Sequence, residues 1–400
     1  MQKRKTLVVI GAGASGLAAA VTAKKESINK NIPLDVIIIE QNDRIGKKLS
    51  ATGNGRCNLS NKNMSEKHYN NSAKQLDNTF FNKDSIIRLK SFFENIGIVL
   101  KSDNEGRLYP YTFNTLSVVK CFEYAINNLG IEVIYNFKVS SILKYKNGFL
   151  IEDLNGKKKF ADKIIVATGG AAAPHLGSND SGYKLLEDVG HSIIPISSAL
   201  VPVKIKNYQS NLKGVRWNCY VKLLENDKII YENSGEVQFT EYGLSGIVIM
   251  QLSRYINESK NYTVLLDLMP EYSIAKINDI LSKNITLLGF SSQILTGLIN
   301  LKLGDFIFSK INLCEKLYVN KLSEIIKNLE FIVLKKMSFD KAQITKGGIK
   351  LNEFNPKTLE SLIQKSIFAA GEVLNIDGDC GGYNLHFAFL SGITAGENIF

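Results

Sequence analysis

The stretch TLVVIGAGASG near the start of the chain constrains the fold more than any other feature. A short apolar, β-branched run ends in closely spaced glycines, and a segment of small residues then reads as a helix from about Ala14 to Lys25. The next apolar run, LDVIIIE at 34–40, has no polar alternation, as expected of a parallel strand covered on both faces. Strand, helix and strand in this succession predict a βαβ unit and an α/β fold class.

The glycines of this turn fit the pattern G-x-G-x-x-G, each with its own task. Gly11 permits a tight turn, and Gly13 lets the backbone approach a pyrophosphate. Gly16 allows the helix to pack closely on the strand. Because the helix begins here, the amides of Ala14 and Ser15 present hydrogen-bond donors and a partial positive charge to an anion. The pattern predicts a dinucleotide site.

Glu40 ends the second strand, where a carboxylate can accept hydrogen bonds from both hydroxyls of an adenosine ribose. A carboxylate at this position opposes a 2′-phosphate. The bound nucleotide is therefore expected to be FAD or NAD rather than NADP.

Later segments favour FAD over NAD, because an extended FAD needs contacts from distant parts of the chain. Three segments combine glycines with a strand end or a helix start, and in the last of them the helix amides are placed to face the flavin ring. Their candidate cofactor-binding residues are Thr168, Gly169, Gly170, Gly371, Glu372, Gly382, Tyr383 and Asn384. No second G-x-G-x-x-G indicates a separate nicotinamide domain, so NADH or NADPH would act as a transient donor.

Composition narrows the class of protein. The 400 residues suit two or three packed units, and no run of eighteen apolar residues predicts a membrane span, so a cytoplasmic protein is expected. Five cysteines form no CxxC pair, which fits reduced thiols and predicts no metal site. The net charge of +11 is dispersed among acidic residues. This dispersion favours a solvated surface over a nucleic-acid partner.

The pattern of apolar residues and glycines changes at two points along the chain. Segments from 196 to 268 alternate like an antiparallel sheet or small barrel, and 272–330 reads as short helices. Glycine-rich strands return from Ala342. We therefore expect a discontinuous FAD-binding domain, 1–190 and 341–400, and an inserted domain, 191–340, with a β-barrel over about 191–270 and a helical part over about 271–340.

Several long motifs resemble one family. GKKLSATGNGRCNLSN, ATGGAAAPHLGSNDSGY and DGDCGGYNL, with others in the insert, are similar to bacterial FAD-dependent oxidoreductases that include aminoacetone-oxidase-like and dehydro-bile-acid-reductase-like proteins. The resemblance covers both ends of the chain and the insert. It implies a glutathione-reductase-like Rossmann FAD-binding domain interrupted by an insert with a β-barrel and a small helical part.

The resemblance also implies further cofactor contacts. The GNGRCN loop would lie against the FAD, with Lys47 and Lys48 near its phosphates, although each lysine is equally consistent with a solvated side chain. Val139 would present its backbone to the adenine. In the loop, Asn54 replaces a glycine common in the family and should tolerate a left-handed conformation. The implied loop contacts are Gly53, Gly55, Arg56 and Asn58.

The sequence assigns no catalytic residue. His386 is a candidate proton donor, against the alternative of a histidine satisfied within its helix. Tyr383 and Cys57 are further candidates. The alternative for Tyr383 is core packing, and the alternative for Cys57 is a structural or flavin-adjacent thiol. Glu241 is a minor candidate acid in a segment that reads as a turn.

Several functions remain open at this point. The expected function is hydride transfer through non-covalent FAD, either from NADH or NADPH to an activated C=C bond of a small molecule, or as an oxidase of a small amine or alcohol that forms peroxide. The sequence is also consistent with a flavin-bound RNA-binding module without turnover and with an NAD-dependent dehydrogenase. Neither the substrate nor the oligomeric state follows from the sequence.

Overall fold

The computed structural model describes the chain except for residues 1–3, 209 and 312–317. Cys314 therefore lies outside the described residues. The chain divides into two compact units: unit 1 comprises Met1–Ser197 and Ile344–Phe400, and unit 2 comprises Ser198–Gln343. Unit 1 is thus built from both ends of the chain. None of the described helices is long and apolar enough to cross a membrane.

A five-stranded parallel sheet forms the centre of unit 1, in the order β19-β10-β1-β2-β6. In its central pairs, Leu7 lies opposite Val36 on one side and Lys163 on the other. Parallel pairing needs crossover connections, and α1 (Ala14–Asn29) supplies the one from β1 to β2. The strands are β1 (Lys5–Ile10), β2 (Leu34–Ile39), β6 (Glu132–Ile134), β10 (Lys163–Val166) and β19 (Ile367–Ala369).

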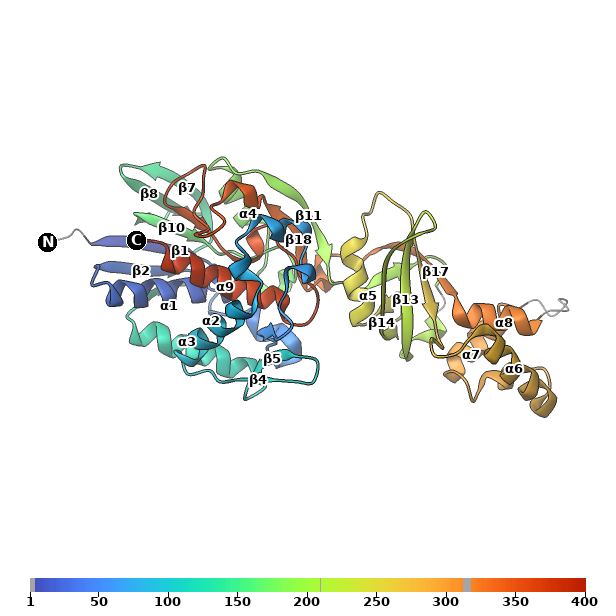
Figure 1. The fold of residues 1–400 in the computed structure, drawn as a ribbon. Coiled ribbons are helices and arrows are strands. Elements are labelled where there is room, and N and C mark those ends of the chain that lie inside the picture. The colour runs from blue at the N-terminus through green and yellow to red at the C-terminus, as the bar shows by residue number, and fades with distance from the viewer. Residues whose placement is uncertain (1–3, 209, 312–317) are drawn as a thin grey trace. The chain divides into compact units, whose positions relative to one another are not determined.

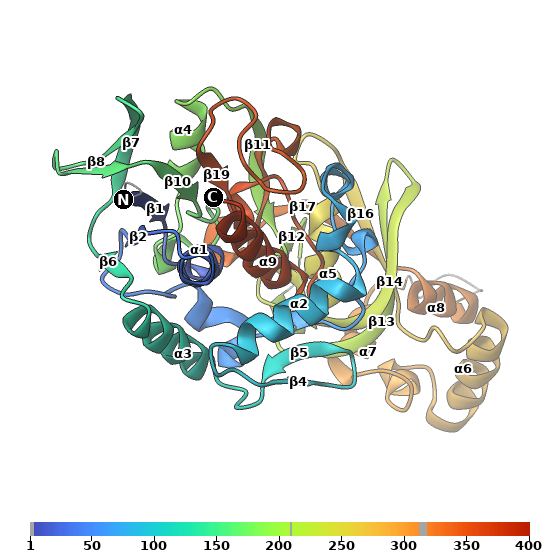
Figure 2. The same ribbon diagram turned by 60° about the vertical axis from the view of Figure 1, so that its left-hand side comes forward.

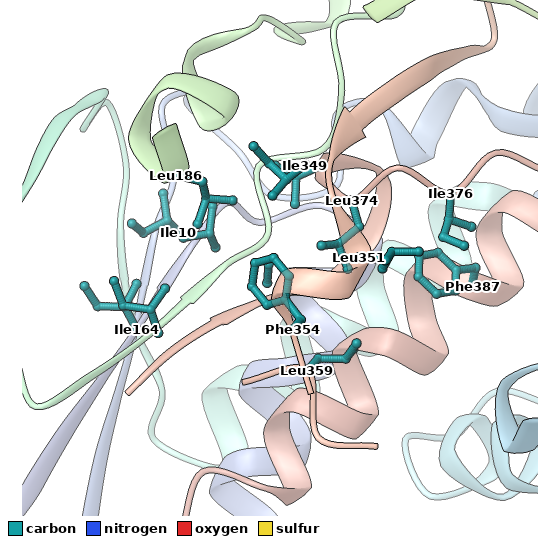
Figure 3. Close-up of a cluster of buried hydrophobic side chains, with 14 of the residues drawn as sticks. Ile10, Ile164, Leu186, Ile349, Leu351, Phe354, Leu359, Leu374, Ile376 and Phe387 are labelled. Carbon is teal, nitrogen blue, oxygen red and sulfur yellow. The ribbon is translucent and has the colours of Figure 1, made fainter. Parts of the chain in front are cut away.

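Both faces of this sheet are buried, which explains why its strands are apolar throughout. Leu7, Val9 and Ile38 belong to a core shared with the helices α1, α2 (Lys83–Glu94), α3 (Thr115–Asn128) and α9 (Tyr383–Glu397). The alternate residues, such as Ile10 and Ile164, face a second core on the other side, which also contains Leu186 of α4 (Ser181–Glu187) (Figure 3).

The second face is covered by smaller β-structure in place of a full helical layer. One antiparallel sheet consists of β7 (Val139–Tyr145), β8 (Gly148–Asp153) and β9 (Lys158–Ala161). Another sheet pairs β11 (Ile193–Ala199) with β18 (Ile344–Ile349). A further antiparallel sheet of unit 1, in the order β3 (Ser60–Asn61), β5 (Arg107–Pro110) and β4 (Leu100–Ser102), borders both cores, since Leu108 belongs to the second core and Leu100 packs against the first. The prediction that the barrel begins at about 191 is wrong, because β11 pairs with β18 and is not a barrel strand.

Helices α1 and α9, from opposite ends of the chain, pack side by side along the sheet (Figure 1). Their approach depends on glycine. A Cβ at Gly392 would lie 2.1 Å from the Ser15 carbonyl oxygen, and one at Gly396 would lie 2.6 Å from the Ala19 carbonyl oxygen. The backbone of α9 thus contacts the first turns of α1, the part of the helix that carries the glycine motif.

Unit 2 contains a closed barrel in the strand order β12-β15-β14-β13-β16-β17, with helices α6, α7 and α8 grouped next to it (Figure 2). The elements are β12 (Val203–Ile205), β13 (Arg216–Glu225), β14 (Lys228–Phe239), β15 (Gly243–Ser245), α5 (Ile247–Leu252), β16 (Tyr262–Asp267), α6 (Ile274–Leu288), α7 (Leu301–Phe308), α8 (Tyr318–Lys327) and β17 (Leu329–Lys336). The prediction of a helical part to about 340 is wrong at its end, because β17 pairs with both β16 and β12 and closes the barrel.

Candidate functional site

The turn between β1 and α1 has the geometry that its glycines predict. Gly11 adopts φ +104°, and a Cβ there would lie 2.5 Å from the Ala167 carbonyl oxygen. A Cβ at Gly16 would lie 1.9 Å from the Gly11 carbonyl oxygen, so the helix start and the turn are in contact. Gly13, in contrast, has no atom within 4 Å of the Cβ position. The first and third glycines permit packing, and the second leaves open space at the start of α1.

Glu40 holds this turn in place. One carboxylate oxygen accepts a hydrogen bond from the Ala12 amide at 2.7 Å, and the other accepts from the Asn42 amide at 2.8 Å and from its side chain at 2.6 Å. Lys47 donates to the Asn42 side-chain oxygen at 3.2 Å. A carboxylate has about four acceptor positions, so capacity remains for a ribose hydroxyl. The ribose contact itself stays a prediction.

A second group of contacts is centred on Glu372 and Thr345. Lys48 forms an ion pair with Glu372 at 2.8 Å, and the other Glu372 oxygen accepts from the Thr345 amide at 2.6 Å. The Thr345 hydroxyl oxygen accepts from the Ala171 amide at 2.8 Å. Gly170 lies against this group, since a Cβ there would be 2.5 Å from that hydroxyl oxygen. Thr345 was missed by the sequence reasoning, and nothing in its local sequence marks this contact.

The GNGRCN loop, part of which is the 3-10 helix η1 (Leu49–Gly55), is strongly curved and exposed at its tip. Gly53 and Gly55 adopt φ +58° and +81°. Asn54 adopts φ +52°, which confirms that it tolerates the left-handed region. Arg56 is exposed, whereas Asn58 is half-buried. Gly53, Asn54 and Gly55 therefore lie in the left-handed region in succession, and this curvature is compatible with an anion-binding loop.

The N-terminus of α9 lies against this loop. Gly382 adopts φ +100°, and a Cβ there would lie 2.3 Å from the Ser60 carbonyl oxygen and 2.6 Å from the Asn58 side-chain oxygen. The Asn384 side chain accepts from the Gly378 amide at 2.8 Å and donates to the Gly378 carbonyl at 2.9 Å. It therefore closes the loop before α9, so only its backbone amide is left for the predicted flavin contact.

Gly371 and Val139 are also placed by backbone contacts. The Gly371 amide donates to the Ser391 hydroxyl at 2.9 Å, and a Cβ at Gly371 would lie 2.5 Å from the Ser15 hydroxyl oxygen. Gly371 thus links α1, the helix that follows the glycine turn, to α9. Val139 is buried at the start of β7, opposite Asp153. Its proposed contact with adenine stays a prediction.

Two buried polar atoms at the site lack a partner among the described residues, and this fits a bound dinucleotide. They are the Asn58 side-chain oxygen and the Thr168 hydroxyl. Buried polar groups are normally paired, so each is a position for a ligand hydrogen bond. The Cβ positions of Gly55 and Gly169 have no atom within 4 Å, as at Gly13. Open space beside glycines, unpaired polar atoms and a helix start together suit FAD.

His386 is not placed to act as a proton donor. Its ring is fully buried, and burial lowers its pKa to about 4, so it is neutral at neutral pH. Nε2 donates to the Phe80 carbonyl at 3.2 Å, and Nδ1 accepts from the Ser60 hydroxyl at 2.8 Å. Both ring nitrogens are therefore occupied within the core. The role of a satisfied core histidine, which the sequence left as the alternative, describes this residue.

Burial keeps the other two candidates protonated, which removes the nucleophilic thiolate of Cys57 and leaves the role of Tyr383 a prediction. Cys57 is fully buried, and this burial raises the pKa of its thiol to about 12, so the reactive thiolate is not formed near neutral pH. Burial and the nearby Asp379 carboxylate raise the pKa of Tyr383 to about 12. Glu241, in unit 2, pairs with Lys213 at 2.9 Å on the exposed surface and is not part of a catalytic cluster.

His68 and Asp379 were missed by the sequence reasoning. Their side chains lie 3.0 Å apart beside the N-terminus of α9, although they are 311 positions apart in the chain. The His68 ring stacks on Tyr383 with 4.2 Å between ring centroids. Asp379 lies within the DGDCGGYNL motif, but nothing in the sequence marks His68 as its partner.

Known proteins similar to this chain share its full length. Residues 5–398 match the HI0933-like protein Rossmann domain. A 3-dehydro-bile acid delta(4,6)-reductase from Clostridium scindens is 31% identical, with 97% of each chain covered. A ribosomal RNA dihydrouridine synthase from Haemophilus influenzae is 26% identical, with 98% of each chain covered.

A solved structure shares the fold. The 3-ketosteroid delta1-dehydrogenase from Sterolibacterium denitrificans, in complex with 1,4-androstadiene-3,17-dione, superposes with a TM-score of 0.53 at 12% identity, with 99% of each chain covered. The glycine turn, the unpaired polar atoms beside it and the family match over residues 5–398 lead to one conclusion. The chain belongs to the HI0933-like family and is an FAD-dependent oxidoreductase.

Proposed function

We propose that the protein is a reductase that uses NADH or NADPH to saturate a C=C bond conjugated to a carbonyl group. The observation that carries this proposal is the 31% identity to a 3-dehydro-bile acid delta(4,6)-reductase over nearly the whole of both chains. The second relative is a dihydrouridine synthase. Dihydrouridine is uridine with one ring C=C bond reduced, and that bond is also conjugated to a carbonyl. One reaction type therefore accounts for both relatives.

The site supports this chemistry through binding and orientation. FAD, when bound, supplies hydride transfer. The open space at Gly13 and the amides at the start of α1 suit its pyrophosphate, and Glu40 suits its ribose. Lys48 is held by Glu372, so its charge stays beside the glycine turns. Donor amides at the start of α9 suit the electron-rich edge of a reduced flavin.

The test begins with the visible absorbance of the purified protein under anaerobic conditions. A flavin band that bleaches on addition of NADH or NADPH supports the reductase. Recovery of the band is then followed after adding 2-cyclohexenone or progesterone, both of which carry a C=C bond conjugated to a ketone. Free FAD at the same concentration is the control. A band that no nicotinamide bleaches, but that a small amine or alcohol does, would contradict the proposal and favour the oxidase.

A second candidate substrate is a uridine base within RNA. The observation that favours it is the Haemophilus influenzae relative, which acts on ribosomal RNA according to its name. The same reduced protein is mixed with unmodified ribosomal RNA. Band recovery with RNA, lost at high salt, together with dihydrouridine in the RNA by mass spectrometry, would select this substrate over the small molecules. Recovery with 2-cyclohexenone or progesterone alone would reject it.

A further inference from the structure

Reduction of a C=C bond needs a proton as well as a hydride, and the histidine candidate from the sequence cannot supply it. His386 has both ring nitrogens bound in the core. A proton donor must reach solvent on one side and the substrate on the other. His68 is the other histidine beside the start of α9.

Two histidines of unit 1 make the same kind of contact, and their comparison defines what is special about His68. His191 pairs through Nδ1 with Glu353 at 2.9 Å and stacks on Phe354 with 4.4 Å between ring centroids. His68 pairs through Nδ1 with Asp379 at 3.0 Å and stacks on Tyr383 at 4.2 Å. Since a carboxylate only accepts, Nδ1 carries the hydrogen in both.

The second ring nitrogen distinguishes them. Nε2 of His191 accepts from the Ser361 hydroxyl at 2.9 Å, and the His191 side chain is fully buried. Nε2 of His68 has no hydrogen-bond partner among the described residues, and the side chain is 21% exposed. His191 is a closed structural pair, whereas His68 keeps one nitrogen open at a partly exposed position.

The position of His68 relative to the cofactor loops is tightly held. The Asp379 amide donates to the His68 carbonyl at 2.8 Å, and the Asn70 amide donates to the Asp377 carbonyl at 2.9 Å. The Tyr69 hydroxyl donates to the Tyr383 carbonyl at 2.8 Å. The segment containing η2 (Glu66–His68) is therefore bonded along its length to the loop that leads into α9.

That loop also contacts the GNGRCN region. The Asn61 side chain donates to the Gly381 carbonyl at 3.0 Å, and Gly382 lies against Asn58 and Ser60. The loop proposed to line the cofactor, the start of α9 and the open nitrogen of His68 thus belong to one hydrogen-bonded assembly. The ring is oriented by its carboxylate on one side and its aromatic neighbour on the other, as an acid–base group requires.

We propose that His68 donates, from Nε2, the proton that completes reduction of the C=C bond, with Asp379 as the positioning residue. This inference rests on the proposed reductase function. The hydride, which FAD would supply when bound and reduced, would form one C–H bond as the C=C π bond breaks, and the electron pair would move toward the carbonyl. The carbon next to the carbonyl then takes the Nε2 proton. For this step His68 starts as the imidazolium, with a hydrogen on each ring nitrogen. After the transfer the ring is neutral, with the Nδ1 hydrogen still donated to Asp379, and Nε2 takes up a new proton from solvent.

The decisive experiment follows the oxidative half-reaction alone. The FAD-loaded protein is reduced with dithionite under anaerobic conditions, and recovery of the flavin band is timed after adding 2-cyclohexenone, progesterone or ribosomal RNA. His68→Gln should slow recovery by about 10²- to 10⁴-fold, the usual contribution of a general acid. Reduction by NADH or NADPH should keep its rate. Asp379→Asn should give a smaller loss, and His191→Gln is the matched control that should recover as fast as the wild type.

Two further measurements separate catalysis from structure. Imidazole added to His68→Ala should restore much of the lost rate, which repair of a merely structural defect would not do. Diethyl pyrocarbonate should modify His68 in the folded, oxidised protein, and leave His191 and His386 unmodified, as read by mass spectrometry. This readout requires no turnover.

The outcomes are distinguishable. If the reduced wild type recovers with none of the three probes, the proposed function fails and the role of His68 falls with it. If the wild type recovers and His68→Gln recovers equally fast, the role of His68 alone is overturned. An unmodified His68 after diethyl pyrocarbonate treatment would also overturn it, because Nε2 would then not be open.

Discussion

The buried histidine in α9 makes the stability of unit 1 depend on pH. His386 is fully buried, and burial lowers its pKa from the usual 6.5 to about 4. Above about pH 7 the ring is neutral in the folded and the unfolded chain, so it causes no pH dependence. Between 6.5 and about 4 the unfolded chain binds the proton and the folded chain does not. The free energy of unfolding therefore falls as the pH falls through this window.

The size of the effect follows from the pKa difference. At about 1.4 kcal/mol per pH unit, the gap between 6.5 and about 4 amounts to ~3 kcal/mol of stability lost on acidification. Below about pH 4 the folded ring is protonated too, and this contribution stops changing. A loss of ~3 kcal/mol is a large fraction of the stability of an ordinary domain.

The assay compares the wild type with His386→Gln, which keeps an amide for hydrogen bonding and does not titrate. Urea unfolding is followed by circular dichroism at several values between about pH 7 and pH 4. The difference in free energy of unfolding between the two proteins should change by ~3 kcal/mol in favour of the variant at the acidic end. Trp217 is the only tryptophan and lies in unit 2, so its fluorescence reports separately on that unit. A difference that stays constant across the range would refute the reasoning.

Three more results are expected. Cys57 is fully buried, and its pKa is raised to about 12. In the folded protein it should therefore react with iodoacetamide about tenfold more slowly than half-buried Cys121, as measured by mass spectrometry. Equal rates would contradict the burial argument. Gly392→Ala places a methyl group 2.1 Å from a carbonyl oxygen of α1 and should lower the free energy of unfolding by ~2 kcal/mol in urea titrations, whereas no change would show that α9 can shift. Glu40→Ala removes the acceptor of the Ala12 amide and should weaken FAD binding by about 10- to 100-fold in fluorescence titrations, and unaltered affinity would exclude its role at the ribose.

Much of the fold of unit 1 was predictable because backbone constraints are visible in residue types. Apolar runs without alternation indicated a sheet buried on both faces, and the glycine spacing indicated the turn at Gly11 and the helix contact at Gly16. The end of the barrel was predicted wrongly. LEFIVLKK follows a helix directly and carries only a partial alternation, so nothing local separates strand β17 from the helical segment before it.

Only the dinucleotide-binding part of the site could be predicted from the sequence. Glycines and a strand-end carboxylate mark a dinucleotide turn by themselves. The pairing of His68 with Asp379 depends on a contact between residues 311 positions apart, which no local pattern encodes. The burial of His386 was equally invisible, because its neighbours Ser60 and Phe80 come from distant segments.

The discontinuity of unit 1 sets an order of events during synthesis. β19 and α9 come after the whole of unit 2 in the chain, and α9 covers the small-residue face of α1. The ribosome has therefore synthesised the complete glycine turn and the entire barrel long before α9, the helix that covers α1, exists. Until then the first βαβ unit exposes apolar surface to chaperones and proteases. A nascent chain halted within unit 2 would contain every residue of the glycine turn and still lack a complete cofactor site.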